Sequence, residues 1–204
     1  RRRVVVHNRP TTSLASGPTA AGTRAVYVGD VRSSRGAFTM LEAVIAAPPW
    51  ELDVIGPIAA EDAAALEALA AQHPRIRLHG RCSPETTWEI AAGASVGVCM
   101  LESTPAFVDA MPTKIYEYAA AGLAIVCSSL PRPATVVEQH RLGVVVDGSA
   151  EMTASLLHWF SHQDQLEASQ QRSWEWAAET LAGPNEFENA ARQILRECDS
   201  RKRT

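Results

Sequence analysis

Residues 109–122 contain Asp109, Lys114 and Glu117, together with residues that are typical of the two ends of a helix. The Pro-Thr step inside this segment is typical of a helix start, and the closing glycine is typical of a helix end. The first turn of a helix exposes free backbone N–H groups and the positive end of the helix dipole, which together favour phosphate. This segment therefore predicts an anion site at the start of a helix over 113–121.

Two charged side chains of this helix bear on that site. Glu117 can accept hydrogen bonds from hydroxyl groups, although a glutamate in this position also compensates the helix dipole without any ligand, typically by about 0.3–1 kcal/mol. Lys114 lies in the first turn, where the dipole disfavours a cation, so a bound anion would supply the missing compensation. With Asp109 at the other end of the loop, these residues predict a site for phosphate and sugar hydroxyls.

A second loop, residues 29–36, is bounded by glycines and carries Arg32 and Arg35. Guanidinium groups match phosphate oxygens in a bidentate way, and a helix beginning at Gly36 would add amide donors, so this loop is a candidate pyrophosphate site. Its glycine spacing is neither that of a dinucleotide-binding fold nor that of a P-loop NTPase. The alternative for Arg32 is a loop charge that is simply exposed to solvent.

These loops need a scaffold that holds them at one edge. Six short apolar runs have the length and branching of buried strands, namely residues 25–28, 52–55, 76–79, 96–100, 123–127 and 144–146. Helical patterns separate them, at 36–47, 60–72, 84–92, 113–121 and 134–140. This alternation predicts an α/β fold, a doubly wound parallel sheet of about six strands. Ligands bind at the carboxyl ends of such strands, so both loops share one rim.

The third predicted strand ends on the same rim at His79, Gly80 and Arg81. Gly80 permits a ligand to approach the backbone closely, and Arg81 can contact a base or a phosphate. We expect His79 to pack or cap the end of the strand rather than to act as a base, because no carboxylate that could orient it is evident in the sequence.

Bulk properties exclude several classes of function. The 204 residues are 46% hydrophobic and carry a net charge of −4, without the basic field typical of nucleic-acid-binding proteins. No apolar run approaches the ~20 residues that cross a bilayer, and no hydrophobic signal region follows the N-terminal arginines. The four cysteines lie far apart without metal-ligand spacing, which indicates reduced thiols and no metal site. We expect a cytoplasmic protein without a nucleic-acid partner.

The segment 109–122 resembles the signature of the retaining nucleotide-sugar glycosyltransferases of the GT-B architecture, the large family four. That signature has two glutamates separated by seven residues and ends in a Glu-x-x-Ala-x-Gly run; here Glu117 stands at the second position and Asp109 at the first. The Ser-Trp-Glu run at 173–175 is similar to part of the family's late helix. The resemblance implies transfer of a sugar from a nucleoside diphosphate sugar with retention, without a metal or another cofactor.

The resemblance also implies roles for individual residues. Glu117 would bind the ribose and Asp109 the hydroxyls of the transferred sugar. The backbone around Thr113, Lys114 and Ile115 would bind the phosphates.

In the arginine loop, which opens at Gly29, Arg35 matches a cation that grips the diphosphate. Asp30 stands where the family has a second cation, an arginine, and Arg32 could replace that arginine from two residues on. Arg35 would stabilise the leaving diphosphate, which makes Arg35, Lys114 and Asp109 the implied catalytic set. Gly80 would lie against the nucleobase, with Arg81 nearby.

The chain divides into three parts by the same resemblance. Residues 1–22 are an incoming strand and linker, 23–150 a Rossmann-like nucleotide-sugar-binding domain, and 151–204 C-terminal helices packing on that domain, at 151–162, 163–181 and 185–198. The resemblance runs over residues 4–198 and implies the C-terminal half of the enzyme, which would not be sufficient for transfer alone. An absent N-terminal domain would bind the acceptor, a glycan, lipid or small molecule, and could dock the full-length protein on a membrane.

Two other functions remain open at this point. A nucleotide-sugar epimerase shares the architecture and would act without an acceptor. A non-catalytic nucleotide-binding or scaffold domain is the other alternative, and it is favoured by the aspartates at positions 30 and 109.

Overall fold

The computed structural model describes residues 10, 13–18, 22–182, 190–192 and 195. Its centre is a six-stranded sheet in which every neighbouring pair is parallel, in the order β3-β2-β1-β4-β5-β6. The strands are β1 (Arg24–Val28), β2 (Glu51–Ile55), β3 (Ile76–Gly80), β4 (Val96–Cys99), β5 (Ala124–Ser128) and β6 (Gly143–Val146). This is the strand order of a doubly wound fold, and the predicted fold class is confirmed.

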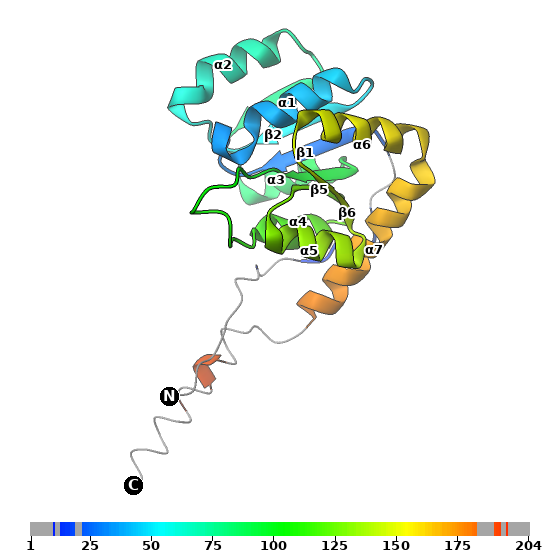
Figure 1. Cartoon of the computed structure of the whole chain (residues 1–204). Coiled ribbons are helices and arrows are strands. Elements are labelled where there is room, and N and C mark those ends of the chain that lie inside the picture. Colours follow the sequence, from blue (N-terminus) through cyan, green and yellow to red (C-terminus); the bar gives the residue numbers. More distant parts are fainter. Residues whose placement is uncertain (1–9, 11–12, 19–21, 183–189, 193–194, 196–204) are drawn as a thin grey trace.

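Helices cover both faces of the sheet (Figure 1). On one face lie α1 (Ala37–Ala46), α2 (Ala60–Ala71) and α6 (Ser149–Ser161), and on the other α3 (Pro84–Ala91), α4 (Thr113–Ala120) and α5 (Pro131–His140). The long α7 (Gln163–Leu181) begins in the core of the first face with Leu166 and reaches the core of the second with Ala177. The central strands β1, β4 and β5 are therefore buried on both sides, which explains why they read as continuous apolar runs. The edge strand β3 is only partly buried and carries Arg77 and His79.

The predicted elements match the observed ones within one or two residues, with two exceptions. Helix α5 begins at Pro131, three residues before the prediction, because a proline in the first turn needs no partner for its missing N–H. The helix expected from Gly36 is preceded by a separate 3₁₀ turn, η1 (Ser33–Arg35). The strand expected near residues 4–10 and most of the helix expected at 185–198 lie outside the described residues.

The site depends on how β1 and β4 separate. These two strands are paired only through Ala25 with Val96 and Val26 with Gly97, near their amino ends. Beyond that point the hydroxyl of Tyr118, from α4, lies between them: it accepts a hydrogen bond from Val28 N at 2.9 Å and donates one to Val98 O at 3.1 Å. One side chain thus replaces the backbone ladder, and the carboxyl ends of β1 and β4 diverge into the crevice typical of a switch point.

Gly97 makes this arrangement possible. A Cβ atom at position 97 would lie 2.3 Å from Cγ of Tyr118, so any other residue would collide with the ring. Tyr118 itself is fully buried, and burial raises the pKa of its phenol well above the ordinary value. The hydroxyl is therefore neutral and can donate and accept at once.

We predict that Tyr118→Phe lowers the free energy of unfolding by about 1–3 kcal/mol, because it leaves the buried Val28 N–H and Val98 carbonyl without partners. Chemical denaturation measures this change. Tyr116→Phe is the matched control on the same helix: Tyr116 stacks on Trp176 through its ring, so its loss of a hydroxyl is expected to change stability little. Equal effects of the two substitutions would contradict the role of Tyr118.

Candidate functional site

Helix α4 presents an uncapped N-terminus to this crevice. Its N-cap is Pro112, whose side chain cannot cap, and within the described chain the N–H groups of Thr113 and Lys114 have no acceptor. The N–H of Ile115 is already engaged, since it donates to Pro112 O at 3.2 Å, and the Ile115 side chain is fully buried. Only two of the three amides expected to bind phosphate are therefore free.

The other end of α4 is closed. Gly122, with a φ of 72°, follows the last turn, its N–H donates to Ala119 O, and Leu123 N–H donates to Tyr118 O at 3.0 Å. This is the Schellman arrangement, which satisfies the last carbonyl groups of a helix. The free hydrogen-bonding capacity of α4 is thus concentrated at the end that faces the crevice.

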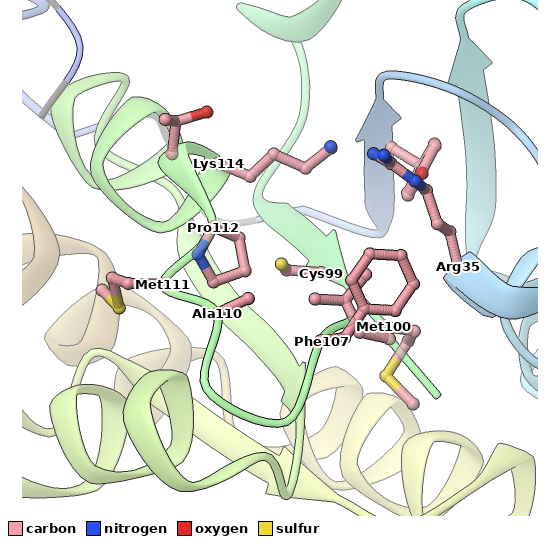
Figure 2. A pocket seen from close by; sticks show the side chains of 11 residues that line it. Arg35, Cys99, Met100, Phe107, Ala110, Met111, Pro112 and Lys114 are labelled. Atoms are coloured by element: carbon pink, nitrogen blue, oxygen red, sulfur yellow. The ribbon is translucent and has the colours of Figure 1, made fainter. Parts of the chain in front are cut away.

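A cavity of about 240 Å³ fills the crevice (Figure 2). It is lined by residues from the end of β1, from η1, from the end of β4, from the loop that leads into α4 and from the first turn of α4: Tyr27, Arg35, Cys99, Met100, Leu101, Phe107, Ala110, Met111, Pro112, Thr113 and Lys114. Of the residues predicted for the site, Arg35, Thr113 and Lys114 therefore lie on its wall.

Arg35 and Lys114 enter this cavity from opposite sides, and their cationic ends point toward one another (Figure 2). Burial lowers the pKa of the Lys114 amine, and repulsion by Arg35 lowers it further. No carboxylate of the described chain lies within ion-pair distance of Lys114, whose Nζ is 5.4 Å from the centre of the Tyr27 ring. The convergence of these two positive charges in a partly buried space favours the binding of an anion.

The position of Arg35 is determined by its neighbours. The guanidinium lies 5.7 Å above the centre of the Phe107 ring, and its Nη2 lies 3.7 Å from Asp30 Oδ2. The preceding Ser33 is tied to α2, because both its N–H and its hydroxyl donate to Asp62. The Nε atom of Arg35 is buried without an acceptor among the described residues, so the side chain keeps a donor for a ligand.

The loop 29–36 differs from the expectation at its end. The N–H of Gly36 donates to Ser33 O at 2.8 Å, and the N–H of Ala37 donates to Arg32 O at 3.3 Å. These two amides, which a helix starting at Gly36 would have offered to a ligand, are therefore used inside the loop, because η1 closes before α1 begins. Arg32 does not line the cavity, and its Nη2 lies 3.6 Å from Asp30 Oδ2.

Three glycines form a row across the rim beside the cavity. Gly29, with a φ of 132°, has its backbone against Lys114, since a Cβ there would lie 2.6 Å from Nζ. A Cβ on Gly56 would lie 1.9 Å from Gly29 O, and Gly56 N–H donates to Gly80 O at 2.8 Å. Nothing lies within 4 Å of the Cβ position of Gly80. Gly80 is thus an open platform two strands away from the cations.

The remaining predicted residues lie outside the cavity wall. Asp109 and Arg81 are exposed. Glu117 is half-buried one turn beyond Lys114, close enough for its charge to favour the protonated amine. The structure therefore brings Arg35, Lys114 and Thr113 together, with Gly29 against Lys114 and with Arg32 linked to Arg35 through Asp30. Gly80, Arg81, Asp109, Ile115 and Glu117 do not line the cavity.

The expectation that no carboxylate lies near His79 is wrong. His79 Nε2 lies 2.7 Å from Oδ1 of Asp53, a residue of β2 that is only 1% exposed. Burial acts to raise the pKa of Asp53, but hydrogen bonds from Arg77 and His79 outweigh it, and the pKa lies below its ordinary value. The sequence could not show this contact because the two residues are 26 positions apart and meet only through the pairing of β2 with β3.

Sequence reasoning did not predict the other residues of the cavity wall, among them Tyr27, Cys99, Met100 and Phe107. Cys99 ends β4 and Met100 follows it, so the rule that ligands bind at the carboxyl ends of strands could have found both. Phe107 carried no pattern, because it lies in an irregular loop. Burial raises the pKa of the Cys99 thiol to about 11, so it is neutral at physiological pH.

A second cavity, of about 290 Å³, lies at the carboxyl ends of β5 and β6. Its charged residues are Glu102 and Asp147, so it disfavours phosphate. Within the residues that the structure describes, no group of three or more His, Cys, Asp and Glu side chains could hold a metal ion. Over the same residues, no helix is long and apolar enough to cross a membrane.

Comparison with solved structures finds this fold in several glycosyltransferases. HepE from Anabaena, solved with UDP and glucose, has a TM-score of 0.67 at 12% identity over 88% of this chain and 49% of its own. The pneumococcal O-GlcNAc transferase GtfA, solved with UDP and GlcNAc, has a TM-score of 0.68 at 15% identity over 92% of this chain and 38% of its own. The chain thus spans less than half of either protein.

A third structure is a single domain. The C-terminal domain of LpcC, a glycosyl transferase group 1 family protein from Francisella tularensis, has a TM-score of 0.63 at 15% identity over 82% of this chain and 94% of its own. At these identities the three likenesses show the fold. Comparison with curated protein sequences finds no match.

The family is shown by the sequence itself. The model of the family described as "Glycosyl transferases group 1" matches residues 22–162, which is more than half of the chain and includes the arginine loop, β4 and α4. The chain therefore belongs to the group 1 glycosyl transferase family.

Proposed function

We propose that this chain is the C-terminal, donor-binding half of a GT-B glycosyltransferase of the family-four type. It would bind a nucleoside diphosphate sugar and take part in transfer of the sugar with retention of configuration. The observation that carries this proposal is the convergence of Arg35, Lys114 and the uncapped start of α4 on one cavity. Each of the three favours an anion, and a diphosphate supplies enough negative charge for all of them.

In this proposal the cations do what a divalent metal does in other transferases. Arg35 and Arg32 bind the diphosphate from one side, and Lys114 with the free amides of α4 binds it from the other. As the bond to the sugar breaks, negative charge grows on the leaving diphosphate, and these fixed donors stabilise it without reorganisation. The reaction would then need no metal ion and no other cofactor.

The rest of the nucleotide sugar would extend along the rim. The open backbone at Gly80 offers a platform for the flat nucleobase, with Arg81 nearby. Glu117 and Asp109 flank the cavity and are proposed to bind the ribose and the transferred sugar. UDP is the first nucleotide to test, because HepE and GtfA were solved with UDP.

The acceptor belongs to another part of the enzyme. We propose that a glycan, lipid or small-molecule acceptor binds to a second, N-terminal domain, and that transfer takes place between the two. This is supported by the chain spanning less than half of HepE and GtfA. We place the full-length protein in the cytoplasm, with docking on a membrane as a property of that other domain.

We predict that one nucleotide from a panel of UDP, GDP, ADP and dTDP raises the melting temperature of this chain, also when EDTA is present. Arg35→Gln is expected to abolish the shift, because it removes a cation from the diphosphate. Arg75→Gln is the matched control, since Arg75 bonds to backbone carbonyls away from the cavity. Each variant is compared with its own nucleotide-free form. No response to any of the four nucleotides would favour a scaffold domain instead.

We predict that Lys114→Met abolishes nucleotide binding and yet raises the melting temperature of the nucleotide-free chain by roughly 2–4 °C. The substitution removes a buried amine that faces Arg35 and keeps a flexible apolar chain in its place, which is worth on the order of 1 kcal/mol. Differential scanning calorimetry measures the stability and titration calorimetry the binding. A large drop in melting temperature would show that Lys114 supports the fold rather than the ligand.

We predict that nucleotide affinity falls as the pH rises from neutral toward the ordinary lysine pKa of about 10.4. The pKa of Lys114 in the free protein is lowered, and a bound anion raises it again, so binding takes up a proton at alkaline pH. Affinity is full below the lowered pKa and is lost as the pH rises through it. In Lys114→Arg the cation stays charged, so its affinity should be flat over this range. Equal slopes for both proteins would contradict the assignment.

A further inference from the structure

Asp30 places a carboxylate inside the arginine loop. Its Oδ2 atom lies 3.6 Å from Arg32 Nη2 and 3.7 Å from Arg35 Nη2, while its backbone carbonyl accepts a hydrogen bond from the Tyr27 hydroxyl at 2.6 Å. The carboxylate therefore contacts both guanidinium groups that would hold the diphosphate. Any anion bound to those groups also lies within a few ångströms of the negative charge of Asp30.

The two arginines remain available despite this contact. Both distances are longer than the roughly 2.7–2.9 Å of a charge-assisted hydrogen bond, and the Asp30 side chain is 45% exposed. The Nε atoms of Arg32 and Arg35 are buried without acceptors within the described chain. Asp30 thus lowers the positive potential of the loop without occupying its donors.

The repulsion between Asp30 and a bound ligand depends on the charge of the ligand. A nucleoside diphosphate sugar carries two negative charges, one on each phosphate. A free nucleoside diphosphate has a terminal phosphate with a second pKa of about 6, so it carries roughly three negative charges above neutral pH. The third charge lies at the terminal phosphate, next to the leaving site and within the field of Asp30. Repulsion by the carboxylate is therefore larger for the free diphosphate than for the sugar-bearing donor.

We infer that Asp30 is a selectivity residue that weakens binding of the free nucleoside diphosphate more than binding of the nucleotide sugar. The inference rests on the proposed function, since it assigns a product to the same cavity. Its consequence is faster release of the spent nucleotide and weaker inhibition by it. The cost is a smaller affinity for the donor as well, because the donor also carries negative charge near the carboxylate.

Asp30→Asn tests this inference, because the amide keeps the shape of the side chain and removes its charge. Titration calorimetry on the 204-residue chain, near pH 7.5, would compare the nucleoside diphosphate found by the panel with its glucose derivative, UDP and UDP-glucose first. We expect both to bind more tightly, and the ratio of the two dissociation constants to shift about three- to tenfold in favour of the free diphosphate.

Two further measurements separate charge from structure. Asp30→Glu keeps the charge and should leave the ratio close to that of the unchanged chain. Near pH 5.5 the terminal phosphate gains a proton, so the shift caused by Asp30→Asn should shrink. Glu42→Gln removes an exposed carboxylate from α1 and is the control for net charge, with no expected change in the ratio.

The outcomes are distinguishable from failure of the proposed function. Equal tightening of both ligands by Asp30→Asn, or a ratio that does not depend on pH, would overturn the selectivity. Loss of binding in a folded Asp30→Asn chain would also overturn it and would make Asp30 a positioning residue for the arginines. If the unchanged chain binds no nucleotide of the panel, the proposed function itself fails, and this inference fails with it.

Discussion

The hydroxyl of Tyr118 between β1 and β4 is the contact on which the site depends. It ends the ladder between the two strands and joins both of them to α4 by hydrogen bonds. Lys114 lies four residues earlier, on the same side of the helix, so the contact that fixes Tyr118 also aims Lys114 into the crevice. The fork in the sheet, the orientation of α4 and the position of one cation therefore share a single cause.

The cavity between the diverging ends of β1 and β4 holds positive charges that destabilise the protein in the absence of a ligand. Lys114 is largely buried and opposite Arg35, and the first amides of α4 have no acceptor within the described residues. The buried charge and the unpaired amides destabilise the ligand-free protein. The two apolar cores on either side of the sheet offset this destabilisation. A site prepared in this way gains most when charge appears on its ligand, as happens on a leaving diphosphate.

Asp30 lowers the positive potential of this site without occupying the cavity. Its carboxylate lies within ion-pair distance of both Arg32 and Arg35 and lowers the positive potential around them. An aspartate here is therefore compatible with a diphosphate site, provided that both guanidinium groups keep free donors. The Nε atoms of both arginines have no acceptor among the described residues.

Several features of this protein were determined by its sequence alone. Alternating apolar runs and helical patterns were sufficient for the doubly wound fold, because each buried strand and each amphipathic helix is a local pattern. The start of α4 and the arginine loop were also recognisable, since proline, threonine and glycine act on the backbone within a few residues. These signals placed Arg35 and Lys114 on one rim before any distance was known.

Other features came only from the tertiary structure. The contact of His79 with Asp53, the ring of Phe107 under Arg35 and the use of the Gly36 and Ala37 amides inside η1 all depend on packing between distant segments or on a turn of a few residues. The same holds for Tyr118, which has the ordinary appearance of an apolar helix residue. The sequence alone determined which residues could meet at the rim, because local backbone preferences act within a few positions. Which of them do meet was decided by the tertiary structure, because only the separation of β1 and β4 sets the space between them.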